Sequence, residues 1–121
     1  MKKILLIEDE KILREMYIEK LNKEGFDVRW ANSAEEGIKI VKEENFDLIL
    51  LDILLPQANG IQFLKEIKKI PQKSEIPIVA FSNYDDAKTK KEAAALGVKE
   101  YLIKTNYTPK EIIEKIKKYL Q

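Results

Sequence analysis

Residues 47–52 read DLILLD, a short apolar run that begins and ends with aspartate. Four consecutive apolar residues without polar alternation are typical of a strand covered on both faces of its sheet. Residues 3–7 (KILLI) and 78–81 (IVAF) have the same character. Strands covered on both faces occur mainly in parallel sheets flanked by helices. The run therefore predicts a buried strand, Asp47–Leu51, in an α/β domain.

Two further segments complete the predicted sheet. Phe26–Trp30 alternates as an edge strand does, and Glu100–Ile103 follows a helical segment. Helical periodicity and end signals predict helices over residues 11–23, from Ser33 onward, from about Gly60 to Ile70, over 86–96 and from Pro109 onward. Five strands alternating with five helices indicate a doubly wound α/β fold.

Several residues mark the predicted helix ends and buried stripes. Ser33 and Glu36 have the spacing of a capping box, Gly25 and Gly97 are stop signals, and Pro71 ends the third helix. The stripes of the first and fifth helices contain Leu13, Met16, Tyr17 and Leu21, and Ile112, Ile113, Ile116 and Leu120.

The composition excludes several kinds of chemistry. The 121 residues include no cysteine and no histidine, so thiol nucleophiles, histidine bases, Cys/His zinc sites and disulfides are excluded. Because 22 basic residues face 21 acidic ones, no overall basic field favours binding to nucleic acid. No apolar stretch is long enough to span a bilayer. We expect a cytoplasmic protein without membrane contact.

Acidic residues follow two of the predicted strands. Glu8, Asp9 and Glu10 follow the first strand, and Asp52 follows the third. Functional groups of doubly wound sheets collect beyond the carboxyl ends of the strands, so these acids are expected to meet there. Carboxylates that lie close together repel one another and favour a bound cation. Oxygen ligands without His or Cys suit Mg²⁺ or Mn²⁺. Alternatively, Glu8 and Asp9 only favour the start of the first helix through its dipole.

A hydroxyl and an ammonium group are expected at the same edge. Ser82 follows the fourth strand and Lys104 the fifth. Together with a metal and a carboxylate nucleophile, they favour a phosphoryl-transfer site, where Lys104 neutralises phosphoryl oxygens and Ser82 donates a hydrogen bond. Taken singly, Ser82 would be a turn hydroxyl and Lys104 a solvated strand end.

This combination resembles the receiver domain of bacterial two-component response regulators, typified by the chemotaxis response regulator. The resemblance covers essentially the whole chain and rests on Glu8–Asp9, on Asp52 in the run that ends at Pro56, on Gly60, on Ser82 and on Lys104. It implies a flavodoxin-like (βα)5 three-layer sandwich with strand order 2-1-3-4-5. It also implies a single receiver domain over residues 1–121 without an output domain, which catalyses only its own phosphorylation and dephosphorylation.

The resemblance also implies roles for individual residues. Asp52 would be the phosphoacceptor, and the ligands of Mg²⁺ or Mn²⁺ would be Glu8, Asp9, Asp52 and the backbone carbonyl of Leu54. The donor would be a sensor histidine kinase or a histidine phosphotransfer protein. Ser82 and Tyr101 would switch the face built from the fourth helix, fifth strand and fifth helix toward a downstream protein or a phosphorylation-dependent homodimer.

Four positions depart from the family pattern. Glu8 replaces the commoner Asp, and Thr105 stands where the family has a proline after a cis bond, a bond that costs roughly 2.5–4 kcal/mol before other residues. Leu54 and Tyr84 are bulky and poorly suited to orient a hydrolytic water, so slow self-dephosphorylation is expected. Asn83 takes the place of a small residue and either narrows the pocket or donates a hydrogen bond.

Three other functions compete with this interpretation. An FMN-binding site is disfavoured because Glu8, Asp9 and Glu10 would repel its phosphate. An aspartate-based phosphatase would carry a second Asp where Leu54 stands. The strongest alternative is a protein-binding module of the same fold that is never phosphorylated, and Thr105 is the feature that favours it.

Overall fold

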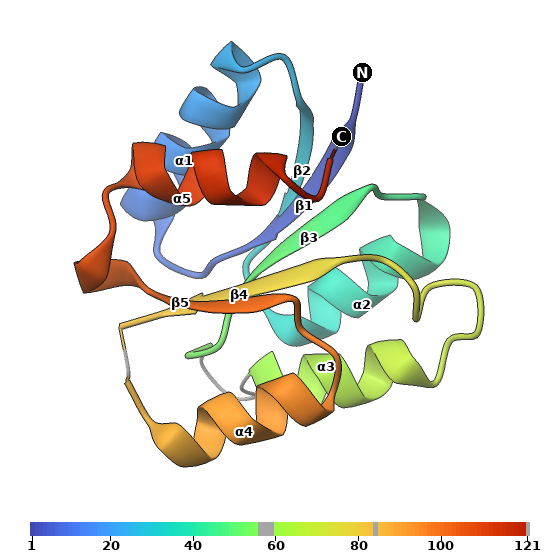
Figure 1. Cartoon of the computed structure of the whole chain (residues 1–121). Helices are drawn as coiled ribbons and strands as arrows, with labels where there is room; N and C mark the ends of the chain where they lie inside the picture. The colour runs from blue at the N-terminus through green and yellow to red at the C-terminus, as the bar shows by residue number, and fades with distance from the viewer. Residues whose placement is uncertain (56–59, 84, 121) are drawn as a thin grey trace.

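The computed structural model describes residues 1–55, 60–83 and 85–120 of the chain (Figure 1). In the described part, one parallel sheet has the strand order β2-β1-β3-β4-β5. Its strands are β1 (Lys3–Ile7), β2 (Asp27–Ala31), β3 (Leu48–Asp52), β4 (Ile78–Ser82) and β5 (Glu100–Ile103). The predicted fold class is confirmed. The three continuously apolar strands occupy the middle of the sheet, and the alternating one is at an edge.

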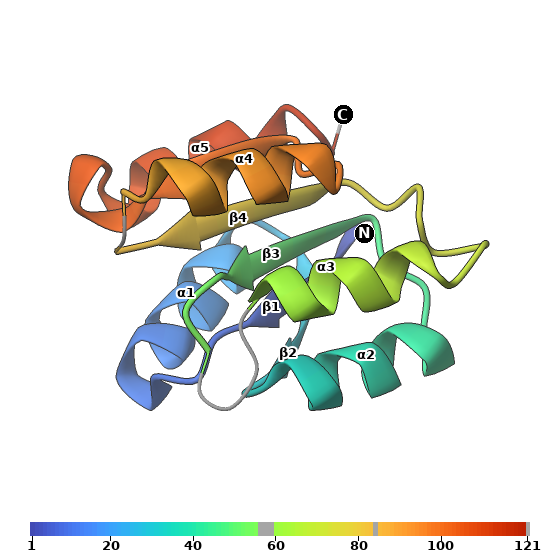
Figure 2. The ribbon, with the colours of Figure 1, turned by 90° about the horizontal axis from the view of Figure 1, so that it is seen from below.

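Helices cover both faces of the sheet. They are α1 (Lys11–Lys23), α2 (Ala34–Glu43), α3 (Gly60–Lys68), α4 (Ala87–Ala95) and α5 (Pro109–Lys117). Helices α1 and α5 lie on one face, and α2, α3 and α4 lie on the other (Figures 1 and 2). Each face therefore has its own apolar core, one containing Leu6, Tyr17 and Ile116 and the other Leu5, Leu51 and Phe63. None of the described helices is long and apolar enough to cross a membrane.

The end of α1 corrects the predicted start of β2. Gly25 adopts a left-handed φ of +89°, and its N–H donates to the Asn22 carbonyl at 3.0 Å. The Phe26 N–H donates back to the Leu21 carbonyl at 3.2 Å, a pattern that closes the helix. Phe26 therefore belongs to the helix end, and the strand begins at Asp27 rather than at Phe26.

The predicted capping box of α2 is half formed. The Glu36 N–H donates to the Ser33 hydroxyl at 3.1 Å, as predicted. The Glu36 side chain, however, accepts from the backbone N–H of Asn32 at 3.2 Å rather than from that of Ser33. The complete box of the chain's described part is at α5, between Thr108 and Glu111. The spacing T-x-x-E before an apolar stripe was its signal in the sequence.

Two strands continue one residue further than predicted, and α3 ends two residues earlier. Strand β3 includes Asp52 and β4 includes Ser82, because both residues keep parallel partners in the sheet. Helix α3 ends at Lys68, because the Ile70 N–H donates to the Ile67 carbonyl in a tighter turn. Pro56, which ends the run on which the family resemblance rests, lies outside the described residues.

Candidate functional site

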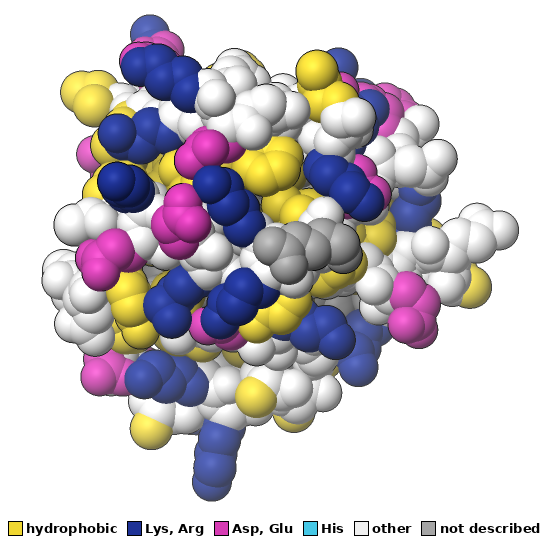
Figure 3. Space-filling model, turned by 45° about the horizontal axis from the view of Figure 1, so that its top comes forward, with side chains coloured by type: hydrophobic (Ala, Val, Ile, Leu, Met, Phe, Trp, Pro, Cys, Tyr) yellow, Lys and Arg dark blue, Asp and Glu magenta, His cyan; other side chains and the backbone are white. Residues whose placement is uncertain are grey.

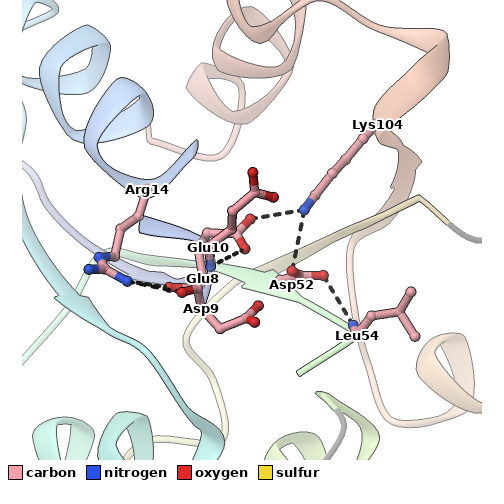
Figure 4. Close-up of polar contacts among 7 residues, drawn as sticks. All are labelled: Glu8, Asp9, Glu10, Arg14, Asp52, Leu54 and Lys104. Atoms are coloured by element: carbon pink, nitrogen blue, oxygen red, sulfur yellow. Dashed lines mark hydrogen bonds and ion pairs between the residues drawn. The ribbon is translucent and has the colours of Figure 1, made fainter. Parts of the chain in front are cut away.

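The carboxyl ends of β1, β3 and β4 place the predicted site residues at one edge of the sheet. Ile7 is the register partner of Leu51, so Glu8 comes level with Asp52. Ser82 is the register partner of Ile103, the last residue of β5, so Lys104, which follows it, enters the same region. Strands far apart in the sequence thus deliver their last side chains to one place (Figure 4).

Three carboxylates gather at this edge. One carboxylate oxygen from each of Glu8, Asp9 and Asp52 lies within 4.8 Å of the other two. Glu8 is 1% exposed and Asp52 is 4% exposed, whereas Asp9 is exposed to solvent. Two acids are therefore desolvated together, with a third at the mouth of the cluster. Such a group needs a nearby cation to remain ionised.

Lys104 supplies one such cation. Its Nζ lies 2.9 Å from Glu8 Oε1 and 3.3 Å from Asp52 Oδ2, and its side chain is only 11% exposed. The ammonium also lies 4.5 Å from the centre of the Phe81 ring. No described peptide bond is cis, so the bond before Thr105 is trans. A short 3₁₀ helix, Lys104–Asn106, follows β5, and Lys104 reaches the acids from it.

The backbone after Asp52 contacts the carboxylate directly. The Leu54 N–H donates to Asp52 Oδ1 at 3.0 Å (Figure 4). This bond leaves the second oxygen, Oδ2, facing Lys104. Leu54 is 44% exposed. The prediction that the Leu54 carbonyl binds a metal stays a prediction.

The surroundings of Asp52 change its protonation. Burial raises the pKa of Asp52 to about 7, and the neighbouring Glu8 carboxylate acts in the same direction. The Lys104 ammonium and the Leu54 N–H oppose this rise in pKa because they stabilise the charged form. Burial and the second acid outweigh them. The site therefore favours added positive charge near Asp52.

Ser82 ends β4 and Tyr101 lies on the neighbouring strand β5. Ser82 is fully buried, and its side chain is hydrogen-bonded to that of Tyr101 on β5. Burial raises the pKa of Tyr101, so this phenol stays protonated at neutral pH. The residues predicted as switch partners are thus in contact. Asn83 is exposed, and Tyr84 lies outside the described residues.

Arg14 is a residue that the sequence analysis missed. It is 9% exposed, and its Nη1 donates to the backbone carbonyls of Glu8 at 3.2 Å and Asp9 at 3.4 Å (Figure 4). Its position three residues before Tyr17 and seven before Leu21 puts it on the buried stripe of α1. That spacing was the available signal, but a charged residue is expected to be exposed.

The donor set fits a hard divalent cation. Glu8, Asp9 and Asp52 offer carboxylate oxygens within reach of one another, and the chain has no cysteine thiol or histidine imidazole. Mg²⁺ and Mn²⁺ prefer such oxygens, and Mg²⁺ commonly keeps several waters. The cluster could therefore bind a metal of this class.

Comparisons with known proteins agree with this arrangement. The profile of the family described as "Response regulator receiver domain" matches residues 4–117. The uncharacterized transcriptional regulatory protein YcbL of Bacillus subtilis (strain 168) is 39% identical over 100 residues, or 83% of this chain. The match covers 43% of YcbL, so the chain corresponds to less than half of that relative.

Solved structures show the same fold. The response regulator TrrA of Thermotoga maritima, solved in complex with Mg²⁺–BeF, is 33% identical with a TM-score of 0.85, and the match covers 98% of this chain and 99% of TrrA. The chemotaxis protein CheY4 of Vibrio cholerae has a TM-score of 0.91 over 98% of both chains. Because CheY4 is 24% identical, its likeness concerns the fold alone.

The fold and these matches define a signalling protein of two-component systems. The chain belongs to the response regulator receiver domain family.

Proposed function

We propose that this protein accepts a phosphoryl group on Asp52 from the phosphohistidine of a sensor kinase or histidine phosphotransfer protein. One observation carries the proposal. The Asp52 carboxylate is buried beside Glu8 and Asp9, and Lys104 Nζ lies 3.3 Å from its Oδ2. A solvated ion pair would not need this cluster of desolvated acids, whereas phosphoryl transfer uses a nucleophile held among groups that stabilise negative charge.

The proposed transfer is an in-line substitution at phosphorus. A carboxylate oxygen of Asp52 forms the new O–P bond while the P–N bond of phosphohistidine breaks, and the ring nitrogen keeps the electron pair. The product is an acyl phosphate. Lys104 would neutralise phosphoryl oxygens, and Ser82 would donate a hydrogen bond to them. Beyond this reaction and its reversal by water, we propose no enzymatic activity.

Glu8, Asp9, Asp52 and the Leu54 carbonyl are the proposed ligands of Mg²⁺ or Mn²⁺. When bound, this ion would supply positive charge that offsets the carboxylates and the incoming phosphoryl oxygens. The convergence of the three acids supports this assignment, as does the Mg²⁺–BeF complex of the relative TrrA. Glu8 carries one more methylene than Asp but the same charge, so its contribution to the metal site is retained.

Ser82 and Tyr101 are the proposed switch. If Ser82 turns toward a phosphoryl group on Asp52, it gives up its hydrogen bond with Tyr101. The change would bias the surface formed by α4, β5 and α5, to which a downstream protein or a second phosphorylated copy would bind. We propose residues 1–121 as one receiver domain acting in the cytoplasm, where a kinase could reach it.

A module that is never phosphorylated is the competing function. Thr105 favoured it because a missing cis-proline could have turned Lys104 away from the acids. Lys104 nevertheless contacts both Glu8 and Asp52 next to a trans bond. This geometry removes the main reason for preferring the alternative.

Phosphodonor labelling tests the proposal. The chain is incubated with Mg²⁺ and acetyl phosphate, and the intact mass is measured for wild type, Asp52→Asn and Asp27→Asn. Asp27 is an exposed aspartate on β2 and serves as the control. We expect one added phosphoryl group in wild type and Asp27→Asn, none in Asp52→Asn, and loss of labelling with EDTA. Equal labelling of Asp52→Asn, or none in wild type, would favour the unphosphorylated module.

A further inference from the structure

Arg14 is a buried cation behind the acidic pair. Among the described residues, no carboxylate forms an ion pair with it, although its guanidinium is largely removed from water. A buried charge needs compensating partners. Its hydrogen bonds go to the backbone carbonyls of Glu8 and Asp9. The charge of Arg14 is thus directed at the loop that carries two of the proposed metal ligands.

Trp30 holds the other side of this guanidinium. The Arg14 Cζ lies 4.1 Å from the centre of the Trp30 ring, a cation–π contact. Trp30 is the register partner of Leu6, and Leu6 belongs to the core beneath α1, so both side chains face that helix. Trp30 is 43% exposed and is the single tryptophan of the sequence. An indole therefore lies directly against a residue that contacts the acidic loop.

We propose that Arg14 is a positioning residue of the cation site. It holds the carbonyls of Glu8 and Asp9 so that their side chains point toward Asp52, and Trp30 keeps the guanidinium in place. Figure 4 shows the acidic pair between Arg14 on one side and Lys104 on the other. The inference rests on the proposed function, because it concerns the same Mg²⁺ site.

The geometry explains why a guanidinium is suited to this task. A single planar nitrogen reaches two successive carbonyls while the flat face stacks on the indole, which a lysine ammonium cannot reproduce. The loop has a second anchor, since the Glu8 N–H donates to the Ala31 carbonyl at 3.0 Å. Substitution of Arg14 should therefore let the carboxylates of Glu8 and Asp9 change orientation, while the bond to Ala31 keeps the backbone of the loop in place.

Metal affinity of the full chain tests the proposal. Mg²⁺ binding is measured by titration calorimetry for wild type, Arg14→Lys, Arg14→Met and Arg29→Met. Arg29 is the chain's other arginine; it pairs with Glu44 on the surface next to Trp30 and is the matched control. We expect Arg14→Met to weaken Mg²⁺ binding by about 10–100-fold, as loss of groups that orient metal ligands does. Arg14→Lys should also weaken it, and Arg29→Met should not.

Trp30 emission gives a second measurement that a purely structural role would not affect. In wild type, Mg²⁺ should change the emission with the same Kd as calorimetry, and in folded Arg14→Lys this response should be lost or reduced. Trp30→Leu removes the ring under the guanidinium, should also weaken Mg²⁺ binding, and checks affinity by calorimetry if Arg14→Met does not fold. Unchanged Kd in both folded variants, Arg14→Lys and Trp30→Leu, would overturn the positioning role. Absence of Mg²⁺ binding in wild type would instead overturn the proposed metal site itself.

Discussion

Asp52 is a carboxyl group that the fold keeps away from water and next to a second buried acid. It is 4% exposed, and burial raises its pKa to about 7 although Lys104 contacts it. Without a further cation nearby, ionising Asp52 costs more free energy in the folded protein than in the unfolded chain. The burial that would hold the proposed phosphoacceptor ready for reaction therefore lowers stability.

The raised pKa predicts how stability depends on pH when metal is absent. The unfolded chain loses the Asp52 proton near pH 3.8, whereas the folded chain keeps it to about pH 7. Because the folded chain binds this proton more tightly, protonation of Asp52 favours folding. This stabilisation is fully present below about pH 4 and is lost as the pH rises toward 7. In EDTA, Asp52→Asn should be more stable than wild type at pH 8 by on the order of 4 kcal/mol, and about equal at pH 4.

Urea denaturation of both proteins across this pH range measures the difference. The exposed Asp27→Asn change is the control and should follow wild type at every pH. If Asp52→Asn were less stable than wild type at pH 8, the carboxylate would be stabilising, and the direction of its pKa shift would be wrong.

Leu54 and Tyr84 predict a long lifetime for the phosphorylated form. Leu54 is 44% exposed beside Asp52, and its side chain offers no group to orient an attacking water. Tyr84 lies outside the described residues, and its part in this prediction rests on the sequence alone. After removal of the phosphodonor, the decay of phospho-Asp52 is followed by intact mass. We expect slow decay in wild type and faster decay in Leu54→Asn; loss of the phosphoryl group within seconds in wild type would contradict this.

At the scale of elements, the first turn of α3 is packed against the end of β3. The Gly60 N–H donates to the Ile53 carbonyl at 2.7 Å, and a Cβ on Gly60 would lie 2.8 Å from the Ile53 Cα and 3.1 Å from the Asp52 carbonyl. The close approach fixes the backbone just after the proposed phosphoacceptor. Glycine at this position is required by space, not by an unusual backbone conformation.

Gly60→Ala should therefore displace the helix or the strand end. We expect it to lower the free energy of unfolding by about 1–3 kcal/mol and to slow labelling of Asp52 by acetyl phosphate. Gly37→Ala is the matched comparison, because its Cβ would meet the side-chain ends of Ile7 and Phe63, which can shift. Denaturation and labelling rates measure both effects. A loss at Gly60 no larger than at Gly37 would mean that the contact with Ile53 relaxes easily.

Most element boundaries follow from local signals. The glycines after α1 and α4 and the caps Ser33, Asp86 and Thr108 act within a few residues, so their effect can be predicted from the sequence. Where a predicted strand or helix end is wrong, it differs from the observed end by only one or two residues, but the cause can lie far away in the sequence. Asp52 belongs to β3 because a neighbouring strand continues the pairing, and no pattern within β3 itself shows that.

At the scale of the whole molecule, the net charge of +1 conceals an uneven distribution. Charged side chains of both signs are interspersed over the face shown in Figure 3. At the sheet edge, in contrast, Glu8, Asp9 and Asp52 face Lys104. The domain as a whole therefore has no strong field, whereas the site favours a cation.

Metal binding should consequently stabilise the whole domain. A ligand that binds only the folded chain adds about 2.7 kcal/mol at one hundred times its Kd. We expect Mg²⁺ to raise the Tm of wild type, to raise that of Asp52→Asn less because one ligand charge is gone, and EDTA to reverse the gain. Differential scanning calorimetry in Ca²⁺-free buffers measures these changes in Tm. Equal gains in both proteins would indicate that Mg²⁺ binds somewhere other than this edge.

The sequence by itself determined the elements, the order in which they alternate and the residues at the strand ends, because hydrophobic periodicity and helix caps act over short distances along the chain. Only the tertiary structure decided which acids are desolvated, that Lys104 reaches Glu8 across 96 residues beside a trans bond, and that Arg14 is buried behind the acidic loop. These features depend on which strands become neighbours and how closely helices pack on them. Burial and electrostatic interaction are properties of that packing, so they arise only when the chain is folded.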